Sequence, residues 1–172
     1  MKRNNNVEFW RFIFTVIVCL LHFCGTYYSG LPYFSGGFIS VEFFYILSGF
    51  LLMASQTKSE LKPDGKISAA KYTFGKLKSL YPHYIFSFVV IFVYVMIDSK
   101  MSLLSTTKIL LNSLWEISML QMSGIRCSIY NQPTWYLSGL IMMGYLIYYL
   151  LNHHRRIFLE VIAPISILFI YA

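Results

Sequence analysis

The sequence predicts an all-α protein, a polytopic transmembrane helix bundle with about five or six membrane helices. Composition supports this, because 57% of the 172 residues are hydrophobic and only 12% are charged. Soluble domains carry about 25% charged residues, so this chain has too few charges to cover a globular surface. The apolar residues also gather in runs close to the length of about 20 residues that a membrane-spanning helix needs.

Five apolar runs are the expected membrane spans. In chain order they are Phe9 to Tyr28, Gly36 to Ser55, Pro82 to Ile97, Thr134 to Leu151 and Ile157 to Ala172. The third begins at a proline, a residue suited to the first turn of a helix. The first two are joined by a short loop without charge, "SGLPYFS", which predicts that they are antiparallel neighbours.

A further apolar segment, residues 103–123, carries a polar stripe. Lys108, Asn112 and Glu116 are spaced four residues apart and would share one face of a helix. If the segment spans the membrane, the basic run "NHHRR" at 152–156 is extracellular; if it does not, that run is cytosolic. We expect a re-entrant or interfacial helix, because spanning would bury Lys108 in lipid.

Residues 56–81 are predicted to form a cytosolic basic loop. Its lysines are Lys58, Lys62, Lys66, Lys71, Lys76 and Lys78. Short lysine-rich loops of membrane proteins face the cytosol, which places the N-terminus inside as well. Apolar residues recur at helical spacing in the second half of the loop, which predicts an amphipathic helix on the inner membrane surface.

Charge and cysteine usage exclude other classes of protein. The net charge of +7 is not gathered with aromatic residues into a nucleic-acid surface, so the expected partner of the basic loop is the lipid bilayer and no nucleic acid is expected. The three cysteines form no C-x-x-C pair and no Cys/His spacing typical of a metal site, so no metal is expected.

Two groups that lipid disfavours, Arg11 and His22, lie in the first span. Eleven residues turn a helix about 20° past three full turns, so the two side chains share a face about 16 Å apart along the axis. With the N-terminus inside, Arg11 lies near the cytosolic boundary and His22 in the outer third of the bilayer. Arg11 alone could extend its charged end to the interface, and a lone histidine could be a satisfied polar group between helices.

Glu42 enters the membrane from the opposite side. It lies about 9 Å below the outer surface, and His22 lies about 20 Å up a core of roughly 30 Å, so the two have a similar depth. An imidazole and a carboxylate at matching depth on neighbouring helices predict a hydrogen-bonded pair in which His22 is a general base. Glu42 could equally be a structural contact, and the residues alone indicate only a polar, proton-handling site.

Four motifs, in order, resemble those of the acyltransferase family 3 membrane proteins. They are "EFWRFIFTVIVCLLHF", with ten residues between Arg and His; "GGFISVEFFYILSGFLL"; the basic run ending "KLKSLYPHY"; and "PTWYLSGLI". The resemblance covers nearly the whole chain. It implies an acyl-CoA-dependent O-acyltransferase of the bacterial cell membrane that moves an acetyl or other short acyl group onto hydroxyls of cell-surface or exported carbohydrate.

The same resemblance implies roles for individual residues. His22 would be the general base on the acceptor hydroxyl, or the residue that handles the acyl group, and Glu42 would orient it. The donor side would be formed by Arg11, Lys76 and Lys78, which would meet the phosphates of acyl-CoA, with Ser48 between the two ends. Acyl-CoA is then a substrate, and no bound cofactor is expected.

Departures from the family pattern leave alternatives open. Ser79 stands where the family's basic run has an arginine, and Leu140 where some members have a glutamate. Family members resemble ten-helix proteins of twice this size, so we expect an N-terminal half, a fragment or a truncated gene product. The alternatives are a transporter or flippase for a glycan or lipid-linked glycan, and an inactive remnant.

Overall fold

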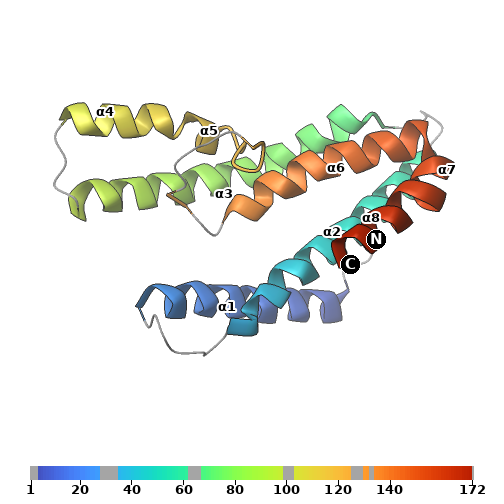
Figure 1. The fold of residues 1–172 in the computed structure, drawn as a ribbon, viewed down its shortest axis with the longest axis horizontal. Coiled ribbons are helices and arrows are strands. Elements are labelled where there is room, and N and C mark those ends of the chain that lie inside the picture. The colour runs from blue at the N-terminus through green and yellow to red at the C-terminus, as the bar shows by residue number, and fades with distance from the viewer. Residues whose placement is uncertain are drawn as a thin grey trace. The chain divides into compact units, whose positions relative to one another are not determined.

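The structure, a computed structural model, describes residues 4–27, 35–61, 67–98, 103–124, 130–131 and 134–171. Within these ranges all regular secondary structure is helical, as Figure 1 shows, and there is no β-strand. The prediction of an all-α membrane bundle is confirmed. Most of the loop predicted outside the membrane, residues 28–34, and Lys62 and Lys66 of the basic loop lie outside the described residues.

The elements follow one another in the order α1 (Asn5–Tyr27), the 3-10 helix η1 (Ser35–Phe38), α2 (Ile39–Glu60), α3 (Ala69–Asp98), α4 (Leu103–Asn112), α5 (Leu114–Ile117), α6 (Trp135–His153), α7 (Arg155–Ile157), the π-helix η3 (Phe158–Ile162) and α8 (Ala163–Tyr171). Contacts divide the chain into two compact units, residues 1–53 and 54–172, with the boundary inside α2. Among the described helices α1, α2 and α3 are long and apolar enough to cross a membrane. Together with η1 they cover the described part of the first three predicted spans.

The first unit consists of α1, η1 and the first part of α2. Phe14 of α1 stacks on Phe43 of α2 with 4.3 Å between the ring centroids. Gly37 of η1 is buried against α1, so closely that a Cβ there would lie 3.0 Å from the Cβ of Leu21 and 3.3 Å from a methyl carbon of Ile17. A glycine is therefore what allows η1 to approach α1.

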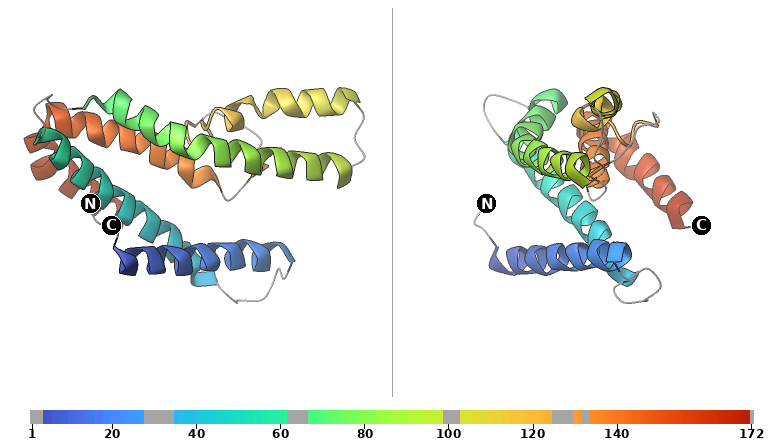
Figure 2. Two further views of the ribbon diagram at one scale, coloured as in Figure 1. Left: turned by 180° about the vertical axis from the view of Figure 1, so that it is seen from behind. Right: turned by 90° about the vertical axis from the view of Figure 1, so that its left-hand side faces the viewer.

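In the second unit, α6 packs antiparallel along α3 (Figures 1 and 2). Tyr148 of α6 stacks on Tyr72 of α3 with 4.3 Å between the ring centroids. Further along α3, Ser87 Oγ accepts a hydrogen bond of 2.7 Å from Nδ2 of Asn131, which precedes α6. The apolar and aromatic core of the two helices contains Ala69, Tyr84, Phe88, Tyr148 and Leu151.

The second unit departs from the sequence prediction in α3. The pattern predicts a surface helix that ends before a separate span at Pro82, whereas the structure has one helix of 30 residues with Pro82 inside it. At 1.5 Å per residue α3 is about 45 Å long. A proline inside a helix costs about 3 kcal/mol or more. Tyr148 of α6 stacks on Tyr72 before Pro82, and Asn131, which precedes α6, bonds Ser87 after it, so contacts on both sides of the proline compensate for that loss.

The polar stripe predicted over residues 103–123 does not lie in one environment. α4 ends at Asn112 and α5 begins at Leu114. Lys108 and Asn112 are exposed, whereas Glu116 and Ser113 are fully buried. The ten residues of α4 are about 15 Å long, half of a core of about 30 Å, so α4 does not cross a membrane by itself. This length fits a re-entrant or interfacial helix.

The chain after α6 returns to the end of α2. Arg155 forms an ion pair with Glu60, with 2.7 Å between Nη1 and Oε2. Asn152 Nδ2 donates to the carbonyl of Ile67 at 2.9 Å, and the amide of Ile67 donates to Ser59 Oγ at 2.7 Å. The basic run at 152–156 therefore lies beside the basic loop, which is the arrangement expected if α4 does not span.

Candidate functional site

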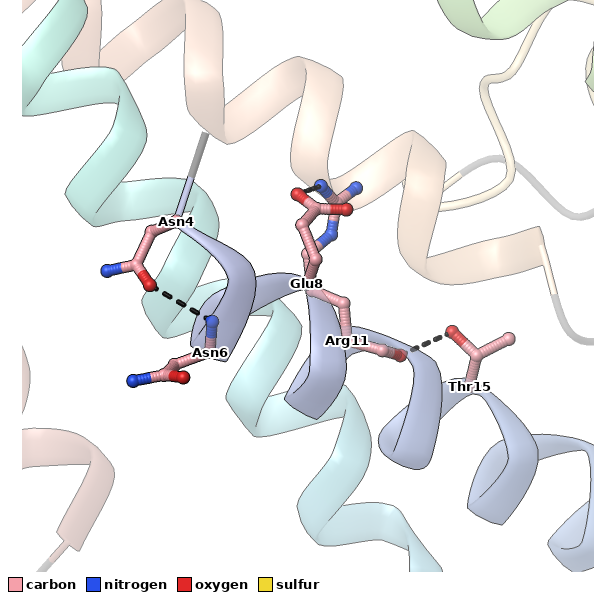
Figure 3. A network of polar contacts seen from close by, with 5 residues as sticks. All are labelled: Asn4, Asn6, Glu8, Arg11 and Thr15. Carbon is pink, nitrogen blue, oxygen red and sulfur yellow. Dashed lines mark hydrogen bonds and ion pairs between the residues drawn. The ribbon is translucent and has the colours of Figure 1, made fainter. Parts of the chain in front are cut away.

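The N-terminal turns of α1 hold a network of polar side chains, shown in Figure 3. Oδ1 of Asn4 accepts a hydrogen bond of 3.0 Å from the amide of Asn6, which satisfies one of the free amides at the start of the helix. Glu8 lies in the first turn of α1, where the helix dipole favours a negative charge. These groups fix the beginning of the helix that carries the predicted donor residue.

The Arg11 guanidinium forms an ion pair through one nitrogen and has further N–H groups that can bind another group. Its Nη1 forms an ion pair with Glu8 Oε1 at 3.0 Å, and its carbonyl accepts a hydrogen bond of 2.7 Å from Thr15 Oγ1 (Figure 3). The Arg11 side chain is 48% exposed. A guanidinium has five N–H donors, so the contact with Glu8 leaves donors that can bind a phosphate.

His22 is half-buried and lies in the last two turns of α1, which ends at Tyr27. The residues of α1 that meet η1 and α2 are Phe14, Ile17 and Leu21. His22 follows Leu21 directly and is therefore turned about 100° around the helix from this contact face. His22 therefore lies outside the contact face formed by these three residues.

Glu42 is exposed on α2. Ser40 and Phe43 of α2 face α1, and Glu42 lies about 200° around the helix from Ser40 and about 100° from Phe43. Both His22 and Glu42 belong to the described residues. The His22–Glu42 pair stays a prediction.

The other predicted donor residues are spread over both units. Ser48 lies half-buried on α2 in the first unit. Lys76 and Lys78 are exposed on α3 in the second unit, and Nζ of Lys76 lies 5.7 Å from the ring centroid of Tyr72, a cation–π contact. Since Tyr72 stacks on Tyr148, this contact ties the position of a donor lysine to the α3–α6 core.

Sequence reasoning missed a buried polar cluster in the second unit. Both carboxylate oxygens of Glu116 accept backbone hydrogen bonds, from Asn131 N at 2.7 Å and from Tyr130 N at 2.9 Å. Tyr84 Oη donates to the carbonyl of Glu116 and accepts a hydrogen bond of 2.7 Å from Gln121 Nε2. The carboxylate thus satisfies backbone amides in a non-helical segment, as buried backbone requires. The four-residue spacing that links Glu116 to Lys108 and Asn112 in the sequence does not predict a contact with residues 130–131.

A second feature missed by sequence reasoning lies in the first unit. A pocket of about 300 Å³ is lined by Phe14, Ile17, Gly36, Gly37, Ile39 and Ser40. Ser40 is 1% exposed, and its hydroxyl has no hydrogen-bond partner among the described residues. A serine in an apolar helix gives no sequence signal that its hydroxyl is unbonded.

Residues 4–172 match the model of a family described as an acyltransferase domain. No curated protein and no solved structure matches the chain. Within the described residues no group of three or more His, Cys, Asp or Glu side chains is arranged to hold a metal ion.

Proposed function

Because the chain belongs to acyltransferase family 3, matched over residues 4–172, it is a membrane acyltransferase, and we propose that it transfers an acetyl or other short acyl group from acyl-CoA to hydroxyls of cell-surface or exported carbohydrate. The observation that carries the proposal is the single unbroken helix that holds both Arg11 and His22. The two are about 16 Å apart along its axis. The pantetheine arm of CoA separates its thioester from its phosphates by a comparable length.

The proposed reaction is a direct transfer. His22 takes the proton of the acceptor hydroxyl, and the hydroxyl oxygen forms a bond to the thioester carbonyl carbon. The carbon–sulfur bond then breaks, and the imidazolium returns the proton to the CoA thiolate. Glu42 would orient His22 and stabilise its charged form.

The donor phosphates are assigned to cationic side chains. The available N–H groups of Arg11 support a bidentate contact, and Lys76 and Lys78 add exposed point charges. Ser48 is assigned to the path between the two ends of the donor. These assignments place the donor at the cytosolic side of a bacterial cell membrane, with the N-terminus inside.

The test measures CoA release from acetyl-CoA by the chain in nanodiscs with a carbohydrate acceptor. His22→Ala should lower the rate by roughly two to four orders of magnitude, the range that general-base groups contribute. The matched control is His83→Ala, because His83 is an exposed histidine on α3. An unchanged rate in His22→Ala would remove His22 from the chemistry. Movement of a glycan across the bilayer without acyl-CoA would favour a transporter.

The Glu42 assignment has its own test. Glu42→Gln keeps the shape of the side chain but removes its charge, so the rate should fall by roughly two to four orders of magnitude if the pair exists. The double variant with His22→Ala should then be hardly slower, because residues that act as one unit are not additive. Full activity of Glu42→Gln beside an inactive His22→Ala would show that the histidine has another partner.

A further inference from the structure

The pocket of the first unit is apolar apart from one hydroxyl. Its side-chain walls are Phe14 and Ile17 of α1 and Ile39 of α2, and η1 contributes the backbone of Gly36 and Gly37. A Cβ added at Gly36 would meet nothing within 4 Å, so there is open space beside this residue. The walls suit a hydrocarbon group, and ligand pockets are commonly apolar with a few placed polar groups.

Ser40 supplies that polar group. A serine or threonine in a helix usually satisfies its hydroxyl on the carbonyl four residues earlier. Thr15 and Ser113 do so here, at 2.7 and 2.8 Å. The hydroxyl of Ser40 is buried in the first turn of α2 and has no partner within the described residues. An unsatisfied buried hydroxyl costs about 1–3 kcal/mol, which a ligand with an acceptor oxygen would recover.

The pocket is lined in part by α1, the helix that carries the proposed base. Gly37, one of its lining residues, is in close contact with Leu21, and Leu21 directly precedes His22 on α1. A carbonyl group held at Ser40 would thus be bound in the same unit as the imidazole. A sugar would fit poorly, because several buried hydroxyls would face apolar walls without partners.

We propose that this pocket binds the hydrocarbon chain of the transferred acyl group, whose carbonyl oxygen accepts a hydrogen bond from Ser40 Oγ. The inference rests on the proposed function and adds the selection of chain length to it. The volume of about 300 Å³ lies at the lower end of the range of ligand pockets. That is more than an acetyl group fills, and we expect acyl chains longer than acetyl to be accepted.

The test compares acetyl-CoA with hexanoyl-CoA. Gly36→Leu fills the pocket, so kcat/KM for hexanoyl-CoA should fall at least about tenfold relative to acetyl-CoA, since apolar pockets discriminate by such factors per methylene. Ser40→Ala should lower kcat/KM for both donors by about ten- to a hundredfold. Its thermal midpoint should stay at or above that of the parent chain, because the hydroxyl has no bond to lose. The control is Thr15→Ala, an exposed hydroxyl on the same unit.

A binding measurement separates the pocket from the reaction. Hexanoyl-CoA should raise the thermal midpoint more than CoA does, and Gly36→Leu should remove the difference. If both variants keep the parent's chain-length preference while His22→Ala is inactive, the pocket is wrong and the proposed function stands. If the parent chain turns over no acyl-CoA but Gly36→Leu still removes the hexanoyl-specific shift, the transfer reaction is wrong and the acyl pocket stands. An equal shift with a short-chain phosphatidylcholine would overturn the inference, because a membrane lipid would then fill the pocket.

Discussion

Glu116 has a fully buried carboxylate whose two oxygens are both used by backbone amides. Glu116→Gln would leave one acceptor oxygen and turn an amide NH₂ group toward a second N–H donor. We expect a loss of about 1–3 kcal/mol in the free energy of unfolding, the cost of a buried donor without a partner. Chemical or thermal unfolding in detergent measures the loss.

The matched control for this change is Glu160→Gln. Glu160 pairs with Arg156 at 3.0 Å, but both side chains are largely exposed, and its removal should change stability by no more than about 0.5 kcal/mol. Equal losses for the two variants would mean that the amide contacts of Glu116 contribute nothing beyond those of a surface group.

At the scale of elements, the burial of residues at the junction of α4 and α5 reverses an expectation from helical spacing. A continuous helix would turn Asn112 toward the polar stripe and Ser113 away from it, whereas Ser113 is buried and Asn112 is exposed. Ser113→Leu should therefore lower the free energy of unfolding through overpacking, by about 1–3 kcal/mol, and Asn112→Leu should be tolerated. A greater loss of stability in Asn112→Leu than in Ser113→Leu would instead support the polar stripe predicted from the sequence.

The contact of η1 with α1 gives a second element-scale prediction, based on two adjacent glycines. Gly37→Ala would place a methyl group 3.0 Å from the Cβ of Leu21, an atom that cannot move without the backbone of α1. We expect a loss of about 1–3 kcal/mol in unfolding free energy. Gly36→Ala meets nothing within 4 Å and should leave the unfolding midpoint close to that of the parent chain. Equal midpoints for both variants would show that η1 and α1 are not in close contact.

At the scale of the whole molecule, the contacts around Ile67 and Glu60 predict one side of the membrane for two distant segments. In a background without native cysteines, a cysteine at Leu61 or at His154 should resist an impermeant thiol reagent in intact cells. A cysteine at Asp98, at the opposite end of the long α3, should be labelled. Labelling at His154 but not at Leu61 would contradict the hydrogen bond from Asn152 to Ile67.

The features that the sequence could predict depend on residues that are close together in the chain. The long apolar runs predict α1, α2 and most of α3 because a membrane span depends on local hydropathy. The motif on α1 indicates Arg11 and His22 for the same reason, since eleven residues on one helix fix their relation. The side-chain contacts of Glu116 and the free hydroxyl of Ser40 depend on segments that meet only after folding. The periodicity of apolar residues in the sequence does not predict these features.

The contacts of the second unit also imply an order of assembly during synthesis. The ion pair of Glu60 and Arg155 joins residues 95 apart and encloses the contact of Ile67 with Asn152, 85 apart. That contact in turn encloses the bond from Tyr84 to Glu116, across 32 residues. Closing a loop costs more as it lengthens, by about 0.6 kcal/mol per doubling. The contact between the middle of α3 and Glu116 should therefore form first. The helix α6 should then pack along α3, toward the end of α2. Glu60 remains without Arg155 until the ribosome has made the chain as far as Arg155.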